Sequence, residues 1–166
     1  MEKISHFIDG KKFSSKNSRT GAIFNPALGE QIAEVELASE EIVKIATENA
    51  AKAFNNWSKT TPIKRARILT TYKDLIIKNM NELAQIVSKE HGKTIPDAKG
   101  SIQRGIEVVE YATGITNALK GEFSSNVGTN VDSHSLRQPL GVCVGITPFN
   151  FPAMVPMWMF PVAIAC

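Results

Sequence analysis

The alternation of hydrophobic and polar residues predicts short strands in the first part of the chain. Residues 4–13 predict two strands around Asp9–Gly10, because this dipeptide tolerates the positive φ of a tight hairpin turn. Residues 32–37 alternate apolar and acidic side chains, which is the pattern of a half-buried strand. The turn residues Asn25–Pro26 separate this strand from the apolar residues 22–24. We therefore expect an N-terminal segment built of strands and turns.

Three amphipathic helices are predicted to follow. The first begins after Ser39, an N-cap residue type followed by glutamates at the positive end of the helix dipole, and it ends near Trp57. The second opens with Thr61–Pro62 and continues to the stop signal Gly92. The third spans residues 96–119. The apolar positions at helical spacing are Ile42, Ile45, Ala46, Ala50, Ala53, Phe54 and Trp57 in the first helix and Ile63, Ala66, Leu69, Tyr72, Leu75, Ile76, Leu83, Ile86 and Val87 in the second.

The last part of the chain changes character again. Residues 122–138 are rich in Ser, Asn, Thr, Val and Gly, which favours two strands around residues 127–130. Residues 142–147 form a short, continuous apolar run, the pattern of a strand buried on both faces of a parallel sheet. Residues 152–165 predict a helix that its own prolines interrupt or kink. The sequence therefore predicts an α/β fold.

The bulk composition narrows the class of protein. With 166 residues and 43% hydrophobic content, the chain is long and apolar enough for one globular domain. The net charge of +3 is scattered, without a basic stripe, so we expect no nucleic-acid partner. The N-terminus lacks a hydrophobic signal segment and the two cysteines form no disulfide framework, so we expect a cytoplasmic protein.

Charged residues disappear from the chain after Arg137, and the sequence ends inside a hydrophobic run. An uncharged segment of this length could suggest a membrane helix. However, Pro148, Pro152, Pro156 and Pro161 interrupt it, and lipid cannot replace the backbone donors that prolines remove, so we expect no membrane insertion. Because apolar side chains need something to pack against, the pattern predicts a chain cut short within its own core.

The cysteines and histidines do not indicate a catalytic or metal centre by themselves. Cys143 lies in the predicted buried strand, where a thiol is normally an inert small hydrophobe, and Cys166 is the last residue. Neither is expected to be a nucleophile. His6, His91 and His134 are far apart and show no ligand spacing, so no metal site is expected.

Arg104 has two interpretations on the third predicted helix. A helical projection at roughly 100° per residue places it within a broad apolar arc, near Val108 and Tyr111. Its guanidinium could reach water from the edge of that arc, or it could stand in a cleft and bind a carboxylate through two hydrogen bonds. The projection alone favours the first interpretation.

The segment Gly145–Pro152 is the sharpest local feature. A predicted buried strand ends there, and the chain turns over two prolines into a helix, which places residues 147–150 at a sheet edge of the kind that binds ligands in α/β proteins. Asn150 is the one amide in an otherwise apolar run, and a buried amide must find partners. It could cap the following helix, bond nearby backbone, or serve a ligand. The G-x-G-x-x-G dinucleotide fingerprint is absent here.

These residues resemble a known family. Residues 140–152, LGVCVGITPFNFP, are similar to the strand-and-turn signature of the aldehyde dehydrogenase superfamily, and the continuation AMVPMWMFP at 153–161 is similar to the CoA-acylating methylmalonate-semialdehyde dehydrogenases. The resemblance extends along essentially the whole chain. Its other parts, in the order of the superfamily's N-terminal region, are FIDG at 7–10, NPA at 25–27, AFNNW at 53–57 and EHGK at 90–93.

The resemblance implies a fold and a set of site residues. It implies that residues 1–166 are an incomplete NAD-binding domain of the atypical Rossmann type, with residues 122–138 a candidate strand pair for homo-oligomerisation. Asn150 would donate its amide N–H to the oxyanion that forms when a cysteine thiolate attacks the aldehyde. Thr147, Pro148 and Phe149 match positions that line the NAD site. Arg104 matches a position that binds the substrate carboxylate, which reverses the preference given by the projection.

The resemblance also implies a reaction that this chain cannot complete alone. Family members oxidise a small semialdehyde with NAD and transfer the acyl group to coenzyme A with loss of CO₂. Their catalytic cysteine, general-base glutamate and cofactor-binding lysine lie beyond the position of residue 166, so the catalytic domain is expected to be absent and the chain inactive by itself. Two alternatives stay open: part of an aldehyde dehydrogenase that does not use CoA, or a non-catalytic remnant that acts as a binding module.

Overall fold

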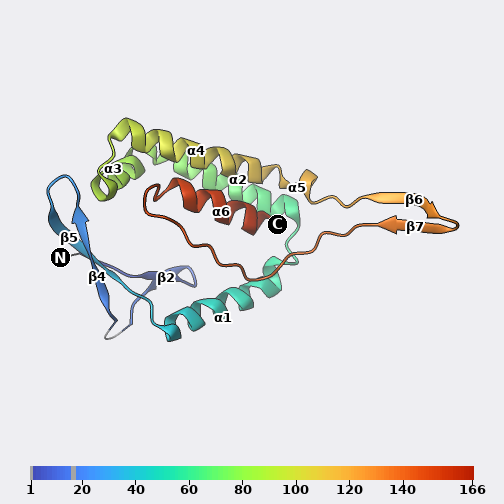
Figure 1. The fold of residues 1–166 in the computed structure, drawn as a ribbon, viewed down its shortest axis with the longest axis horizontal. Helices are drawn as coiled ribbons and strands as arrows, with labels where there is room; N and C mark the ends of the chain where they lie inside the picture. The colour runs from blue at the N-terminus through green and yellow to red at the C-terminus, as the bar shows by residue number, and fades with distance from the viewer. Residues whose placement is uncertain (1, 16–17) are drawn as a thin grey trace.

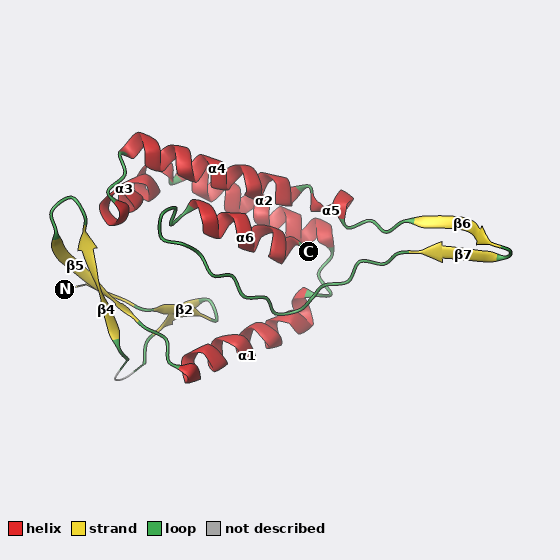
Figure 2. Ribbon diagram, in the orientation of Figure 1, coloured by secondary structure: helices red, strands yellow, loops and turns green. Residues whose placement is uncertain are grey.

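Four helices packed side by side form the body of the molecule, which a computed structural model describes for residues 2–15 and 18–166 (Figure 1). The helices of this layer are α2 (Pro62–Lys78), α3 (Met80–His91), α4 (Ile95–Thr113) and α6 (Met154–Ala165), with the single turn α5 (Ile115–Ala118) after α4. A small sheet lies at one end of the layer, and a hairpin extends from the other end (Figure 2). The last helix, α6, returns along α4, so residues far apart in sequence meet in the body.

The N-terminal sheet has three strands in the order β1-β5-β4. Strands β4 (Thr20–Asn25) and β5 (Glu30–Glu36) are antiparallel and lie on either side of the predicted turn at Asn25–Pro26. Strand β1 (Glu2–Ile4) pairs with β5 in parallel. The pattern analysis did not predict β1, because three residues are too few to show a period. Beside the sheet, β2 (His6–Ile8) and β3 (Lys11–Phe13) form the predicted hairpin. Asp9 and Gly10 both have positive φ, 57° and 69°, which confirms the predicted turn chemistry.

A buried carboxylate ties the N-terminal strands together. Glu36 ends β5 with its side chain fully buried, and one carboxylate oxygen, Oε1, lies 2.8 Å from the Lys3 ammonium of β1. The Ser14 hydroxyl donates to the same oxygen. His6 of β2 approaches the other oxygen, with Nε2 at 3.9 Å. The hydrogen bonds from Lys3 and Ser14 lower the pKa of Glu36 to about 2, against the opposing effect of burial.

This carboxylate makes a pH-dependent contribution to stability. Because its pKa is lowered on folding, the contribution is complete above the ordinary value of 4.5 and is lost as the pH falls towards about 2. We expect Glu36→Gln to lower the melting temperature at neutral pH, and the difference from the unmodified chain to shrink across that interval. Thermal melts followed by circular dichroism over a pH series test this. Glu30→Gln, on the exposed start of the same strand, is the matched control; an equal pH response from both variants would contradict the assignment.

The helix predicted over residues 61–92 is in fact two helices, so that prediction was wrong. Asn79 leaves the helical region, with φ −101° and ψ 16°, and its side-chain amide donates to the carbonyl of Leu75 at 2.8 Å. A side chain that bonds nearby backbone in this way competes with helix continuation. The third predicted helix is also interrupted, at Gly114, between α4 and α5. After the first break α3 packs against α4, and after the second α5 packs against α2.

Helix α1 (Glu40–Trp57) forms where predicted, and the Ser39 hydroxyl accepts a hydrogen bond from the amide of Ile42 at 3.4 Å, which confirms the N-cap. Its predicted apolar stripe is wrong as a core face, because only Ile42 is buried. The helix lies beside the body (Figure 1). At its C-terminal end the indole N–H of Trp57 donates a hydrogen bond to the carbonyl of Ile164 in α6 at 2.9 Å. Ile42, Ala46 and Ala50 of this stripe line a groove of about 450 Å³ shared with β2 and residues 142–145.

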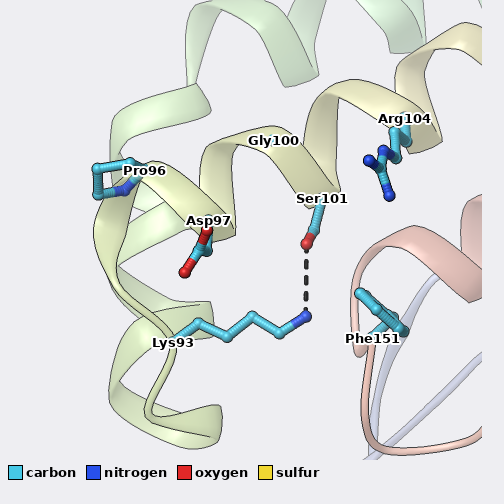
Figure 3. A pocket seen from close by; sticks show the side chains of 7 residues that line it. All are labelled: Lys93, Pro96, Asp97, Gly100, Ser101, Arg104 and Phe151. Carbon is cyan, nitrogen blue, oxygen red and sulfur yellow. Dashed lines mark hydrogen bonds between the residues drawn. The ribbon is translucent and has the colours of Figure 1, made fainter.

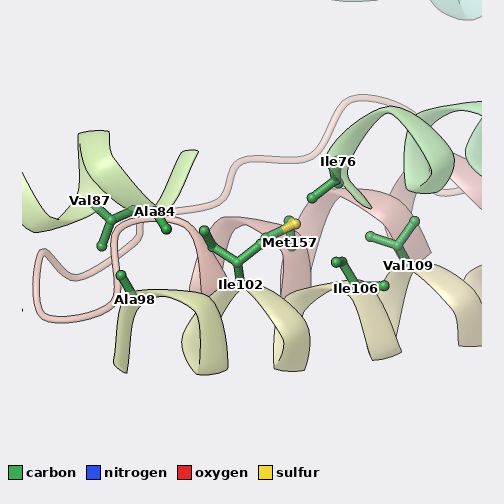
Figure 4. Close-up of a cluster of buried hydrophobic side chains, with 8 residues drawn as sticks. All are labelled: Ile76, Ala84, Val87, Ala98, Ile102, Ile106, Val109 and Met157. Carbon is green, nitrogen blue, oxygen red and sulfur yellow. The ribbon is translucent and has the colours of Figure 1, made fainter. Parts of the chain in front are cut away.

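The core forms around α4, whose buried face is covered by α2, α3 and α6 (Figure 4). Small residues let the helices approach closely: Gly105 lies directly against Met157 of α6. The main cluster of buried side chains comprises Ile76, Ala84, Val87, Ala98, Ile102, Ile106, Val109 and Met157. This packing fixes the start of α6, and with it the segment that leads into α6.

The contact between Gly105 and Met157 leads to a stability prediction. A Cβ atom at Gly105 would overlap the Met157 terminal methyl and lie 3.1 Å from the Met157 Cβ, so Gly105→Ala displaces the Met157 side chain and crowds the contact between the two helices. We expect a loss of about 1–2 kcal/mol of unfolding free energy, as is usual for overpacking. Gly100→Ala on the same helix is the control, since nothing lies within 4 Å of its Cβ position. There the better helix propensity of alanine should stabilise by up to about 1 kcal/mol. Urea unfolding measures both; similar values for the two variants would contradict close α4–α6 packing.

The strand pair predicted around residues 127–130 is present as β6 (Phe123–Gly128) and β7 (Val131–His134). Every residue of both strands is exposed, and the hairpin projects away from the body (Figure 1). Its tip is shaped locally: Asn126 and Asn130 adopt positive φ, and the Asp132 carboxylate accepts from the Asn126 amide at 2.9 Å.

The strand predicted over residues 142–147 does not form. The segment runs as an exposed, irregular chain between α1 and α6, with Val144 84% and Ile146 87% exposed. A strand persists only when a neighbour takes up its backbone hydrogen bonds, and none of the strands between residues 2 and 15 or 18 and 166 pairs with this segment. The segment is apolar, as the sequence indicates. The predicted burial is wrong, because it requires a neighbouring sheet that the described residues do not form. Cys143, expected to be buried here, is also exposed.

Candidate functional site

The connection between α3 and α4 fixes the backbone around Lys93. Gly92 ends α3 in the left-handed conformation, with φ 83°, and a Cβ there would come within 3.0 Å of the Pro26 ring. The Ser88 hydroxyl then donates to the carbonyl of Lys93 at 2.7 Å. Thr94 caps α4, accepting from the amide of Asp97 at 3.3 Å. The backbone of Lys93 is therefore held on both sides.

A pocket of about 290 Å³ lies between the start of α4 and the turn that leads into α6 (Figure 3). Two cations line it, Lys93 and Arg104, and Phe151 closes one side. The one carboxylate that lines it, Asp97, accepts from the Thr94 hydroxyl at 2.9 Å. The remaining lining residues are Pro96, Gly100 and Ser101. A small anionic molecule would find cationic partners in this pocket.

Arg104 lines this pocket from the middle of α4, a placement that fits both of its interpretations. Its side chain is exposed and extends from α4 towards the side of the pocket where Phe151 lies (Figure 3). The residue is also anchored through its backbone, because Trp158 Nε1 of α6 donates to the Arg104 carbonyl at 3.4 Å. Within the described part of the chain its guanidinium is in no ion pair.

Residues 147–150 form an exposed turn immediately before Phe151. The expectation that Asn150 is buried was wrong, since its side chain is exposed. It does not cap the following helix either: α6 begins after Ala153, and no side chain caps it. Phe149 is 90% exposed, and Pro148 has no N–H to contribute. Within the described residues no hydrogen bond engages the Asn150 side chain, and the next residue, Phe151, lines the pocket that contains Arg104.

The sequence analysis missed two residues that shape this site, Lys93 and Phe151. The Lys93 ammonium lies 3.6 Å from the centroid of the Phe151 ring and 3.4 Å from the Ser101 hydroxyl, to which it donates. Lys93 was noted only as part of the segment EHGK. Its approach to Phe151 depends on the packing of α6 against α4, which no local pattern could reveal.

The two cysteines are placed differently from each other. Cys143 is exposed, and its thiol makes one weak contact, donating to the Gly141 carbonyl at 3.7 Å. Cys166 is half-buried and packs against the cluster of Leu69, Ala112, Ile115 and Ala165. Among the described residues no group of His, Cys, Asp and Glu side chains is arranged to hold a metal ion. No helix of the described segments combines the length and hydrophobicity that crossing a membrane requires.

Comparison with known proteins gives the family. Residues 13–166 match the model of the aldehyde dehydrogenase family, and the chain belongs to that family. A malonate-semialdehyde dehydrogenase of Pseudomonas aeruginosa is 48% identical over 100% of this chain and 33% of its own length. The crystal structure of a methylmalonate-semialdehyde dehydrogenase from Oceanimonas doudoroffii superposes with a TM-score of 0.96 at 49% identity, covering 100% of this chain and 34% of that one.

A more distant structure shows the same fold with a cofactor bound. A betaine aldehyde dehydrogenase variant of Staphylococcus aureus, solved in complex with NAD⁺, is 28% identical with a TM-score of 0.89, and the match covers 97% of this chain and 32% of that one. The fold is therefore an incomplete α/β unit of the aldehyde dehydrogenase type, which confirms the family resemblance and the expected fold class. The chain spans about a third of the length of the relatives that it matches.

Proposed function

We propose that residues 1–166 supply the N-terminal part of the NAD-binding domain of a CoA-acylating methylmalonate- or malonate-semialdehyde dehydrogenase, with one wall of its active site. The observation that carries the proposal is the juxtaposition of an unengaged amide, Asn150, with a cationic pocket that contains Arg104. Phe151 connects the two, since it follows Asn150 in the chain and lines the pocket. The relatives named as semialdehyde dehydrogenases support this choice of substrate.

Asn150 is the proposed oxyanion donor. When a thiolate adds to an aldehyde, negative charge develops on the carbonyl oxygen, and a fixed N–H donor at that oxygen stabilises the transition state more than the ground state. An amide suits this task because it donates without titrating. The turn supports the role because Pro148 precedes Asn150 and Pro152 follows it, and both limit the conformations of the backbone.

Thr147, Pro148 and Phe149 are proposed to form part of the cofactor wall. Their side chains are exposed on the turn, and Phe149 presents a flat apolar surface of the kind that packs against a nucleotide. These residues fit one side of a dinucleotide site. NAD, when bound, supplies the acceptor for the hydride that leaves the aldehyde carbon. The chain's own part is to position the cofactor beside the oxygen that Asn150 contacts.

Arg104 is the proposed partner of the substrate carboxylate. A semialdehyde of the malonate type carries an acid group at one end and the reacting carbonyl at the other. Arg104 can bind the acid through two parallel hydrogen bonds, while the other end of the molecule reaches Asn150. The free guanidinium on the pocket wall supports this assignment.

The remaining groups of the reaction are proposed to come from outside these residues. Cys143 and Cys166 lie away from the residues that line the Arg104 pocket, so neither is proposed as the nucleophile or as the carrier of the acyl group before transfer to CoA. The isolated chain is accordingly proposed to be inactive. The β6–β7 hairpin, exposed on every residue, is proposed as the strand pair through which subunits associate.

A hybrid enzyme tests the proposed function. Residues 1–166 would replace the corresponding third of the Oceanimonas doudoroffii enzyme, which is similar along the entire chain. With malonate semialdehyde and NAD, we expect acyl-CoA and CO₂ to form only when CoA is added. Release of a free acid at the same rate without CoA would favour a non-acylating aldehyde dehydrogenase. A hybrid that folds but reduces no cofactor would favour the binding-module alternative.

A further inference from the structure

The pocket beside Asn150 contains a lysine whose surroundings are unusual for an ammonium group. Lys93 is half-buried, and within the described residues it makes no ion pair. Its Nζ instead has two partners, the ring of Phe151 at 3.6 Å and the Ser101 hydroxyl at 3.4 Å (Figure 3). An ammonium at that distance over an aromatic face is attracted by the ring quadrupole. The side chain therefore bridges α4 and the turn before α6.

The two ends of this bridge differ in rigidity. On the lysine side, Gly92 and the Ser88 hydroxyl fix the backbone, and Ser101 belongs to the packed body of α4, where it is itself buried. On the other side, residues 147–150 are all exposed. Phe151 is the first residue after this exposed turn that packs against the body. A contact that immobilises the Phe151 ring also limits where the backbone of Asn150 can lie.

We propose that Lys93 is a positioning residue: its ammonium, which is hydrogen-bonded to Ser101, holds the Phe151 ring and thereby fixes the turn that carries Asn150. This inference rests on the proposed oxyanion role of Asn150 for its effect on the reaction, but the contact and the rigidity of the turn are independent of that role. Lys93 touches neither the reacting oxygen nor the cofactor in this account. Its charge acts on the ring, and the ring acts on the turn.

A second cation for the substrate carboxylate is the competing role for Lys93, because Arg104 lines the same pocket. The two roles differ in what they change. A positioning residue affects every aldehyde alike, through the rate of the chemical step. A carboxylate-binding residue affects the KM of substrates that carry an acid group and leaves uncharged aldehydes unaltered.

The rigidity of the turn is measured on the 166-residue chain itself, by ¹⁵N heteronuclear NOE values for the amides of residues 149–151. Lys93→Met keeps the length of the side chain and removes its charge, and we expect it to lower those values while the amides of α4 around Ile102 stay unchanged. Lys93→Arg retains a cation over the ring and should restore them. Phe151→Leu should reproduce the effect of Lys93→Met. Lys99→Met is the control, because Lys99 lies near the start of α4 but does not line the pocket. Unchanged NOE values in both Lys93→Met and Phe151→Leu would overturn the proposal.

The kinetic arm uses the hybrid enzyme. We expect Lys93→Met to lower kcat for malonate semialdehyde and for propanal by the same factor, about three- to tenfold, with KM unchanged. Combined with Phe151→Leu, it should cause no further loss, because the two residues act through one contact. A higher KM confined to the semialdehyde would overturn the positioning role in favour of carboxylate binding. A hybrid that lacks activity before any substitution would refute the proposed function, and the NOE measurement would still decide whether Lys93 holds the turn.

Discussion

Asn150→Ala in the hybrid enzyme should lower kcat for aldehyde oxidation by about 10²–10³-fold, the usual cost of removing one oxyanion donor. KM should change little, because the amide contacts the oxygen most strongly when that oxygen carries charge in the transition state. The exposed position of Asn150 makes this a clean substitution: its side chain supports no other part of the described structure, so folding should be unaffected.

Two further variants sharpen this prediction. Asn150→Asp preserves the shape of the side chain but replaces the donor by a negatively charged acceptor, so it should be at least as impaired as the alanine variant. Asn117→Ala, an exposed position in the single turn α5, controls for the loss of an amide elsewhere. An Asn150→Ala enzyme that retained most of its kcat would exclude the oxyanion role, whatever happened to KM.

Arg104→Ala should lower kcat/KM for malonate semialdehyde by about 10–100-fold and leave propanal unchanged, because a charge-assisted, two-point hydrogen bond to the acid group is lost. The decrease should lie mainly in KM. Arg104→Lys should recover only part of it, since an ammonium cannot make the paired contact.

The control for this experiment is Arg67→Ala, an exposed arginine on α2 that does not line the pocket. It should leave both substrates unaffected. Equal losses for the semialdehyde and for propanal in Arg104→Ala would contradict the carboxylate role and would point to a structural effect of the substitution.

Features governed by neighbouring residues could be predicted from the sequence. The Asp9–Gly10 hairpin, the Ser39 cap and the β6–β7 pair each depend on a few adjacent side chains, and all three are present. The single long helix predicted across Asn79 failed for a related reason: the periodic apolar pattern outweighed one residue whose side chain bonds the preceding turn. Periodicity shows which side of a helix is apolar, but it does not show that the helix is continuous.

Features that depend on distant packing could not be predicted in this way. The apolar residues 142–147 were expected to be buried in a sheet, but the described residues provide no strand to pair with them, and they stay exposed. The neighbourhood of Arg104 and Phe151, and the bridge from Lys93, exist because α6 folds back onto α4. The helical projection of α4 alone could not show that Arg104 and Phe151 line one pocket.

The most direct test of the account is the rate of NADH formation by the hybrid that carries residues 1–166 in place of the matching third of the Oceanimonas doudoroffii enzyme. If this chain supplies a competent cofactor-and-oxyanion wall, the hybrid should oxidise malonate semialdehyde at a rate within about tenfold of the parent enzyme, a loss comparable to one imperfect contact. A hybrid that melts cooperatively and assembles like the parent, yet forms no NADH, would contradict the account.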